Sequence, residues 1–150
     1  MAVFYDSRTG FPVGDPDAIP LAGALPSRME LDAAFSPLIL SASGWRKVFT
    51  VSGDEEERNS AIGSANAVLA AHMADVFADY LVARDPSGPR RVVLGLDSRP
   101  TGTEIGDIMC RVFISRGFDV RYLFIAAAPE IMAYAREIGA FAYVSASHNP

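Results

Sequence analysis

The stretch Arg91-Val92-Val93-Leu94-Gly95-Leu96-Asp97-Ser98-Arg99 decides the fold of this chain. Its first six residues form a compact apolar run, which is typical of a strand buried on both faces of a parallel sheet. The turn-forming residues 85–89, Asp-Pro-Ser-Gly-Pro, come before it, and polar residues follow it. We therefore predict a buried parallel strand at 91–96 with a polar loop at its carboxyl end.

Strands and helices alternate on the carboxyl side of this strand. We predict a helix from Thr101, a strand at 119–125, a helix at 129–138 and a strand at 141–145. Alternation at this spacing implies right-handed crossovers and a mostly parallel sheet that helices cover on both faces. The predicted fold class is α/β, a three-layer αβα domain.

Two helices carry clear sequence signals. From Ser60 to about Arg84 apolar residues recur every three or four positions, which predicts a long helix with one buried stripe. In the next helix Thr101 and Glu104 have the spacing of a capping box, and an apolar stripe ends near Gly117. The expected core-facing residues are Ile62, Ala65, Leu69, Met73, Val76, Phe77 and Tyr80 in the first helix and Ile105, Ile108, Met109, Val112 and Phe113 in the second.

The N-terminal residues differ from the rest of the chain. Residues 1–37 are dense in glycine and proline, so we expect an irregular N-terminal arm with regular structure that is short at best. Residues 38–51 hold two short β-prone runs broken by small residues, which fits a bent strand or a hairpin. We assign residues 38–150 to the α/β domain.

Composition narrows the classes of partner and compartment. The length of 150 residues fits one domain, and 13 Lys and Arg against 18 Asp and Glu leave a net charge of −5. Nucleic acid and anionic membrane are therefore poor partners, whereas a small anion bound at a local cationic site is compatible. A single cysteine, Cys110, fits a reducing compartment, and no stretch approaches the about 18 apolar residues of a membrane span. We expect a cytoplasmic protein with no membrane partner.

The chemistry-bearing residues follow the predicted strands. Ligand sites in such sheets form beyond the carboxyl ends of the strands, where Asp97-Ser98-Arg99 and Ser147-His148-Asn149-Pro150 lie. Ser147 stands next to the imidazole of His148, and a serine becomes a phosphoryl carrier only with a base, cation or metal nearby. On these residues alone, a plain polar turn remains the simpler alternative.

Three segments together resemble one family, the α-D-phosphohexomutases. Residues 145–150, Ser-Ala-Ser-His-Asn-Pro, resemble its phosphoserine loop, in which the first residue is usually Thr. Residues 43–47, Ser-Gly-Trp-Arg-Lys, resemble its Ser-Gly-x-Arg segment, and residues 95–99 resemble its Gly-x-Asp-x-Arg strand end. Over residues 38–150 the chain is similar to the first domain of a phosphoglucomutase or phosphomannomutase.

The resemblance implies an isomerase of carbohydrate metabolism. In the family the serine that matches Ser147 is phosphorylated and gives its phosphate to a hexose monophosphate, and the bisphosphorylated sugar then returns its other phosphate. Hexose 1-phosphate and hexose 6-phosphate are thereby interconverted. Mg²⁺ is the implied cofactor, and hexose 1,6-bisphosphate is the implied intermediate and activator.

The same resemblance assigns roles to individual residues. Arg46 would face the phosphate at the centre of the site, and His148 would contact the phosphate or sugar and assist proton transfer. Lys47 matches the phosphoglucomutase-like variant and favours glucose over mannose. Arg99 and Asn149 join Lys47 in the expected substrate-binding and phosphate-binding set, Arg99 by pairing with Asp97 or bracing the loop and Asn149 by holding its own loop.

The chain also departs from the family pattern. It ends at the phosphoserine loop, so we expect the 150-residue chain alone to be inactive, with Mg²⁺ meeting only the phosphate on Ser147. Ala128-Pro129 stands where relatives commonly carry Thr-Pro. The alternative is a catalytically inactive, truncated α/β module with residual phosphate binding. A nucleotide-binding domain is disfavoured because no strand is followed by a glycine-rich phosphate loop. The hexose, the general base and the oligomeric state stay open.

Overall fold

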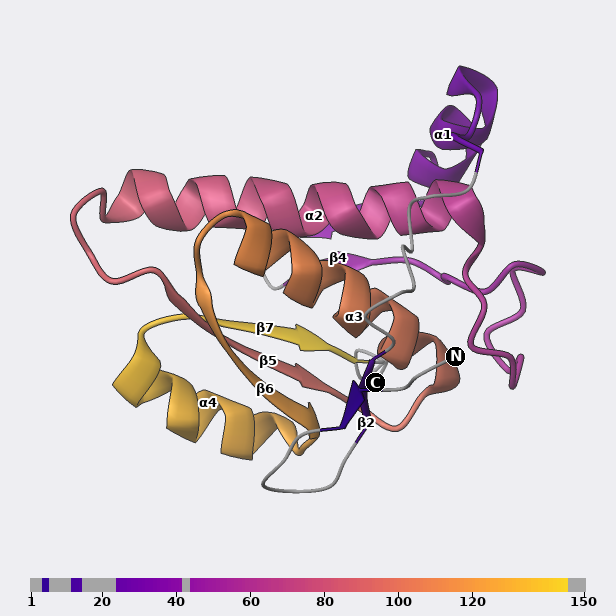
Figure 1. The fold of residues 1–150 in the computed structure, drawn as a ribbon. Coiled ribbons are helices and arrows are strands. Elements are labelled where there is room, and N and C mark those ends of the chain that lie inside the picture. The colour runs from indigo at the N-terminus through magenta and orange to yellow at the C-terminus, as the bar shows by residue number, and fades with distance from the viewer. Residues whose placement is uncertain (1–3, 6–11, 15–23, 42–43, 146–150) are drawn as a thin grey trace.

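From residue 63 onward the chain alternates between helices and strands (Figure 1). The structure, a computed structural model, describes residues 4–5, 12–14, 24–41 and 44–145, with the side chains of the last two ranges. Its elements in chain order are β1 Phe4–Tyr5, β2 Pro12–Gly14, α1 Arg28–Phe35, β3 Ile39–Ser41, β4 Gly44–Arg46, α2 Gly63–Arg84, β5 Arg91–Leu96, α3 Pro100–Ser115, β6 Asp119–Ile125, α4 Ala128–Ile138 and β7 Phe141–Val144.

β5 is the middle strand of a parallel sheet of order β6-β5-β7. Its first residue is exposed and the next five are buried, as its apolar sequence predicts. α2 and α3 lie over one face of the sheet and α4 lies over the other (Figure 1). The predicted α/β fold with three αβα layers is confirmed. In this arrangement helices exclude water from both faces of the parallel strands.

The core has two parts, one on each side of β5. Val92 and Leu94 pack into the larger cluster, with residues of α2 and α3, while Val93 packs against Ile131 and Ala135 of α4. Alternate side chains of a strand point to opposite faces, so neighbouring residues of β5 serve different layers. One short strand thereby joins both parts of the core.

The predicted buried stripe of α2 is confirmed in part. Ile62 and Leu69 are buried as expected, Ala65, Met73 and Phe77 are partly buried, and Val76 and Tyr80 are 42% and 55% exposed. Small residues fill most of the rest of the buried side, and alanine lets a helix backbone approach its neighbours closely. The buried residues of α2 are Ala67, Leu69, Ala70, Ala74 and Ala78.

α3 has the predicted stripe but a different beginning. Of its five expected core residues four are buried, and Val112 is partly buried. The predicted capping box of Thr101 and Glu104 is wrong, because the helix begins at Pro100 with Arg99 as N-cap and no side-chain cap. Proline is favoured at the first helical position, where its missing N–H costs no hydrogen bond.

The N-terminal segment contains a helix that the glycine and proline content did not predict. α1 spans eight residues, and Ser27 with Glu30 forms a capping box in which each side chain bonds the other's backbone. β3 and β4 form an antiparallel hairpin, which confirms one of the two expected arrangements. Its second strand is Gly44–Arg46, earlier than the apolar run 48–51 that suggested it.

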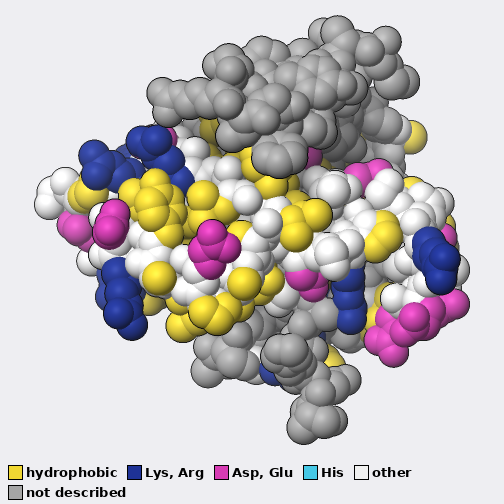
Figure 2. Space-filling view, turned by 90° about the horizontal axis from the view of Figure 1, so that it is seen from below, with side chains coloured by type: hydrophobic (Ala, Val, Ile, Leu, Met, Phe, Trp, Pro, Cys, Tyr) yellow, Lys and Arg dark blue, Asp and Glu magenta, His cyan; other side chains and the backbone are white. Residues whose placement is uncertain are grey.

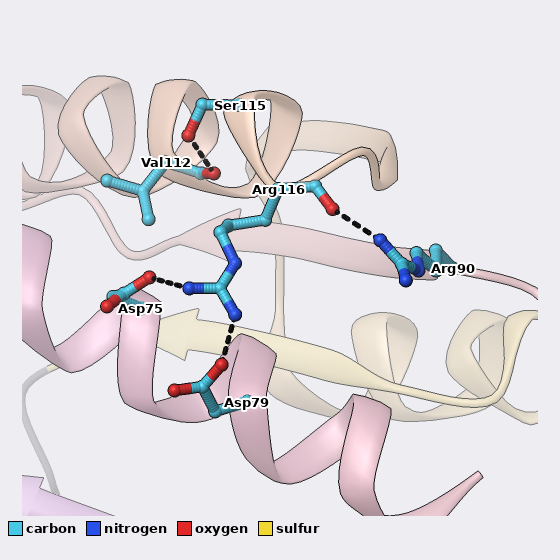
Figure 3. Close-up of polar contacts among 6 residues, drawn as sticks. All are labelled: Asp75, Asp79, Arg90, Val112, Ser115 and Arg116. Carbon is cyan, nitrogen blue, oxygen red and sulfur yellow. Dashed lines mark hydrogen bonds and ion pairs between the residues drawn. The ribbon is translucent and has the colours of Figure 1, made fainter. Parts of the chain in front are cut away.

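Arg116 fastens the end of α3 to α2 (Figure 3). Its guanidinium group forms ion pairs with Asp75, at 2.5 Å, and with Asp79, one turn apart on α2. These side chains are partly exposed, and exposed ion pairs contribute little to stability. The packing of α2 on α3 therefore rests mainly on the buried stripe.

No helix in the described ranges has the length and apolar character needed to span a bilayer.

We predict that Gly95→Ala destabilises the domain. A Cβ at Gly95 would lie 2.1 Å from Cδ1 of Ile131, whose side chain is fully buried and has no room to move. Overpacking of this kind costs about 1–3 kcal/mol in the free energy of unfolding. Denaturation in urea, followed by circular dichroism, measures the loss.

Gly102→Ala is the matched control for this substitution. Gly102 is also buried, but its added Cβ would meet neighbours at 3.8 Å, an ordinary contact. Since alanine is the better helix former, this variant should be unchanged or more stable by up to about 1 kcal/mol. Equal destabilisation by both substitutions would contradict the tight contact between Gly95 and Ile131.

We predict that the stability of the domain falls between pH 9 and pH 11. Burial, with a smaller effect of Asp107, raises the pKa of the Cys110 thiol from 9.0 to about 11. The unfolded thiol therefore loses its proton at a lower pH than the folded one, which favours unfolding across this window.

Urea denaturation across this pH range should show a smaller fall in stability for Cys110→Ala than for the wild type. An identical fall in both proteins would contradict the burial of the thiol. Burial also raises the pKa of Tyr122, so part of the alkaline loss should persist in this variant.

Candidate functional site

The segments that follow β5, β6 and β7 meet at the carboxyl edge of the sheet. The backbone N–H of Asp97 donates to the carbonyl of Val144 at 2.9 Å, and that of Ala126 donates to the carbonyl of Leu96 at 3.1 Å. These bonds extend the sheet beyond the ends of its strands. The loop after β5 is thus held directly beside the end of β7.

The connections diverge at this edge. β5 leads into α3 on one face, whereas its neighbour β6 leads into α4 on the other (Figure 1). α/β proteins bind ligands outside the carboxyl ends of such strands, because a crevice opens where the connections of neighbouring strands leave to opposite faces of the sheet. The topology therefore places the candidate site where the sequence predicted it.

A bulge marks the end of β6. The register between β5 and β6 shifts between Leu94 and Leu96, and Phe124 has a φ of 55°. This conformation is rare for a large side chain, and bulges are frequent beside active sites. The ring of Phe124 stacks on that of Tyr122, with the centroids 4.5 Å apart. The apolar pattern of β6 carried no sign of the bulge.

Asp97 shapes the loop after β5. Its Oδ1 accepts a hydrogen bond from the backbone N–H of Arg99 at 3.0 Å, which closes a turn just before α3. Arg99 is exposed, and among the described residues it enters no ion pair. The side chain of Asp97 braces the loop through the backbone of Arg99, and the expected role of the Arg99 side chain stays a prediction.

Tyr143 belongs to this edge, although the sequence analysis did not single it out. Its hydroxyl group donates to the carbonyl of Ala126 at 3.1 Å, which joins β7 to the loop after β6 across the end of β5. Gly95 is its partner in the register. Burial, and then the charge of Asp97, raise the pKa of Tyr143.

Arg46 and Lys47 lie at the end of β4. Arg46 is exposed, and the Nζ of Lys47 is 5.9 Å from the centroid of the Phe49 ring. Burial lowers the pKa of Lys47. Phe49 packs against the larger core cluster, and its carbonyl accepts a hydrogen bond from Nδ2 of Asn66 at 3.1 Å. The cationic pair is thus tied to the first turns of α2.

The structure brings together only part of the predicted site. Within the described ranges, no hydrogen bond or ion pair joins Arg46 or Lys47 to the loop of Asp97 and Arg99. Ser147, His148 and Asn149 lie outside the described residues. Three of six predicted residues are therefore placed, on two separate segments.

The described residues do not supply a metal site by themselves. In the ranges with described side chains, no group of three or more His, Cys, Asp or Glu side chains is arranged to hold an ion. Mg²⁺ prefers oxygen ligands and commonly takes them from a substrate phosphate as well as the protein.

We predict that Tyr143→Phe loosens the carboxyl edge. The variant loses one hydrogen bond to Ala126, which should lower the free energy of unfolding by about 0.5–1.5 kcal/mol. Tyr80→Phe is the matched control, because Tyr80 is exposed on α2 and should be neutral. Urea denaturation of both variants decides the matter, and equal stabilities would rule out the bond between β7 and the 126–127 loop.

Comparison with known proteins gives one match. The sequence model of one family domain, described as phosphoglucomutase/phosphomannomutase, alpha/beta/alpha domain I, matches residues 41–150. The matched range contains β4, the whole β6-β5-β7 sheet and the segment 145–150. No similar curated protein and no similar solved structure was found.

Proposed function

The chain belongs to the phosphoglucomutase/phosphomannomutase family, and from this premise we propose that it carries the phosphoserine of a hexose-phosphate isomerase. Family membership supports an isomerase of carbohydrate metabolism that binds phosphosugars. The proposed reaction interconverts hexose 1-phosphate and hexose 6-phosphate through a bisphosphorylated sugar. Ser147 carries the phosphate between the two steps.

One contact of the described residues carries this proposal. The hydrogen bond from Asp97 to Val144 joins the Gly-x-Asp-x-Arg segment to the strand that leads into Ser147, three residues further on. The two segments come from distant parts of the sequence and share one edge of a parallel sheet. Such an edge is where α/β proteins hold phosphorylated ligands.

The proposed reaction consists of two phosphoryl transfers. In the first, a sugar hydroxyl oxygen forms a bond to phosphorus, the bond from phosphorus to Oγ of Ser147 breaks, and the hydroxyl proton passes to a base. In the second, Oγ of Ser147 forms a bond to the phosphorus of the other phosphate, the bond from that phosphorus to its sugar oxygen breaks, and the sugar oxygen takes up the proton from the base, so the phosphoserine is restored. His148, next to the carrier, is the proposed partner for proton transfer.

Positive charge is the main help that a protein gives to such a transfer, because charge spreads over the equatorial phosphate oxygens. Arg46, Lys47 and Arg99 are the proposed sources, together with Mg²⁺ held through the phosphate of Ser147. Asn149 is proposed to hold the phosphoserine loop. We propose glucose as the preferred hexose, supported by Lys47 in the Arg-Lys segment that phosphoglucomutase-like members share.

We predict that the purified protein carries phosphate on Ser147 and that Ser147→Ala abolishes it. Turnover of glucose 1-phosphate by the protein made from its complete reading frame should fall at least about 10³-fold in this variant, because no carrier remains. Intact mass with phosphopeptide mapping reads the modification, and a coupled assay with glucose 1-phosphate and mannose 1-phosphate reads activity and preference.

Ser87→Ala provides the control for this experiment. Ser87 is an exposed serine in the turn before β5, at the opposite end of the sheet, and its loss should leave both phosphate and turnover in place. An unmodified Ser147, with no turnover in the presence of Mg²⁺ and glucose 1,6-bisphosphate, would contradict the enzyme. The inactive module with residual phosphate binding would then be the better account.

A further inference from the structure

A hollow of about 230 Å³ lies at the amino edge of the sheet, opposite the candidate site. It is bordered by the end of α2, the turn at 85–89, the first residue of β5 and the turn between α4 and β7. Of the residues proposed for phosphoryl transfer, those that the structure describes, Arg46, Lys47 and Arg99, do not line it. The hollow therefore needs an explanation of its own.

Arginine side chains dominate the charge of this hollow. Arg84, Arg90 and Arg91 line it together with one carboxylate, Asp85, which leaves two positive charges (3 − 1) in a chain whose net charge is −5. Figure 2 shows cationic side chains gathered at the end of the molecule where the strands begin, on the left as in Figure 1. In the described ranges, none of the three arginines forms an ion pair with a carboxylate.

The helix dipole accounts for only one of these arginines. Arg84 lies in the last turn of α2, where a cation stabilises the negative end of the helix. Arg90 and Arg91 lie outside the helices, so this explanation does not apply to them. In the described ranges neither forms an ion pair, although Asp119 on β6 is the register partner of Arg91.

Arg90 is held in place by the protein backbone (Figure 3). Its Nη1 donates to the carbonyl of Arg116 at 3.1 Å, just beyond the end of α3. A guanidinium group has five N–H donors, so this bond leaves others available for a ligand. Fixing a long side chain before binding lowers the entropy that a ligand must overcome.

The lining below the arginines is apolar. Leu81, Val82 and Ile138 are half-buried and Phe118 is buried, so the hollow combines an apolar floor with a cationic rim. Guanidinium groups match pairs of oxygens on phosphate. We propose that this hollow binds a small phosphate ester, with the phosphate on the arginines and a compact apolar body on the floor.

Residue-resolved NMR distinguishes this site from the carboxyl edge of the sheet. The amides of Gly88, Gly139 and Ala140 report the hollow, and those of Asp97 and Ser98 report the carboxyl edge. Titration of the ¹⁵N-labelled protein with phenyl phosphate should shift the first set, and inorganic phosphate should do so with lower affinity because it lacks an apolar body. About 1 M NaCl should weaken both, since the Debye length is then only about 3 Å.

Substitutions test the arginines directly. Arg90→Gln with Arg91→Gln should weaken phenyl phosphate binding at least about tenfold, because each charge-assisted hydrogen bond contributes about 1.5–3 kcal/mol. Arg58→Gln with Arg136→Gln is the matched control, since it removes the same two charges at exposed arginines that do not line the hollow and that enter no ion pair in the described ranges. It should bind within about twofold of the wild type, because it removes no hydrogen bond to the phosphate.

Three results would overturn the proposal. Chemical shift changes confined to the amides of Asp97 and Ser98 would place the phosphate at the carboxyl edge alone. Unchanged affinity in the double variant, with a well-dispersed spectrum as evidence of folding, would exclude the arginines. Equal loss in the control that combines Arg58→Gln with Arg136→Gln would reduce the effect to general charge. The proposal does not rest on the proposed isomerase, whose test reads Ser147.

Discussion

Hydrogen bonding of β5 to a strand on each side is the constraint on which the structure depends. β5 pairs in parallel with β6 and with β7, and five of its six residues are buried. A strand in this position must be apolar on both faces, and it must have a small side chain or none wherever a helix approaches closely. Gly95 meets the second demand, because it makes room for Ile131 on α4. The same strand ends in Asp97, so the packing of the core sets the position of the candidate site.

Local pattern was enough to predict the elements from 91 to 145. β5 and β6 have the predicted bounds, and α4 and β7 differ from theirs by one residue at most at each end, because apolar runs, Pro129 and Gly139 mark them. The buried face of α2 was predictable only in part. Ile62 and Leu69 are buried as expected, but much of the contact surface is alanine, whose weak apolar signal is outweighed by the exposed Val76 and Tyr80. Which face a helix buries is settled by the elements that it meets.

The site was predictable to a similar, partial extent. Asp97 and Arg99 follow β5 directly, so the sheet topology alone places them at the carboxyl edge. Arg46 ends a hairpin strand of three residues, and Lys47 follows it. Their position depends on the contact of Phe49 with the core and on its hydrogen bond with Asn66 of α2. Tyr143 and the bulge at Phe124 gave no sequence signal, since both arise from how strands pair. Motifs thus identified the chemistry, whereas tertiary contacts determine how much of it converges.

Hydrogen exchange at the amide of Asp97 tests the central claim most directly, because that N–H joins the loop after β5 to Val144. The account predicts that this amide is protected to the same degree as those of Val93 and Leu94 inside β5, since all would exchange only when the sheet opens. Free exchange of the Asp97 amide alongside protected β5 amides would contradict it. The two motif-bearing segments would then not be held together, and the carboxyl edge would lose its claim to be the site.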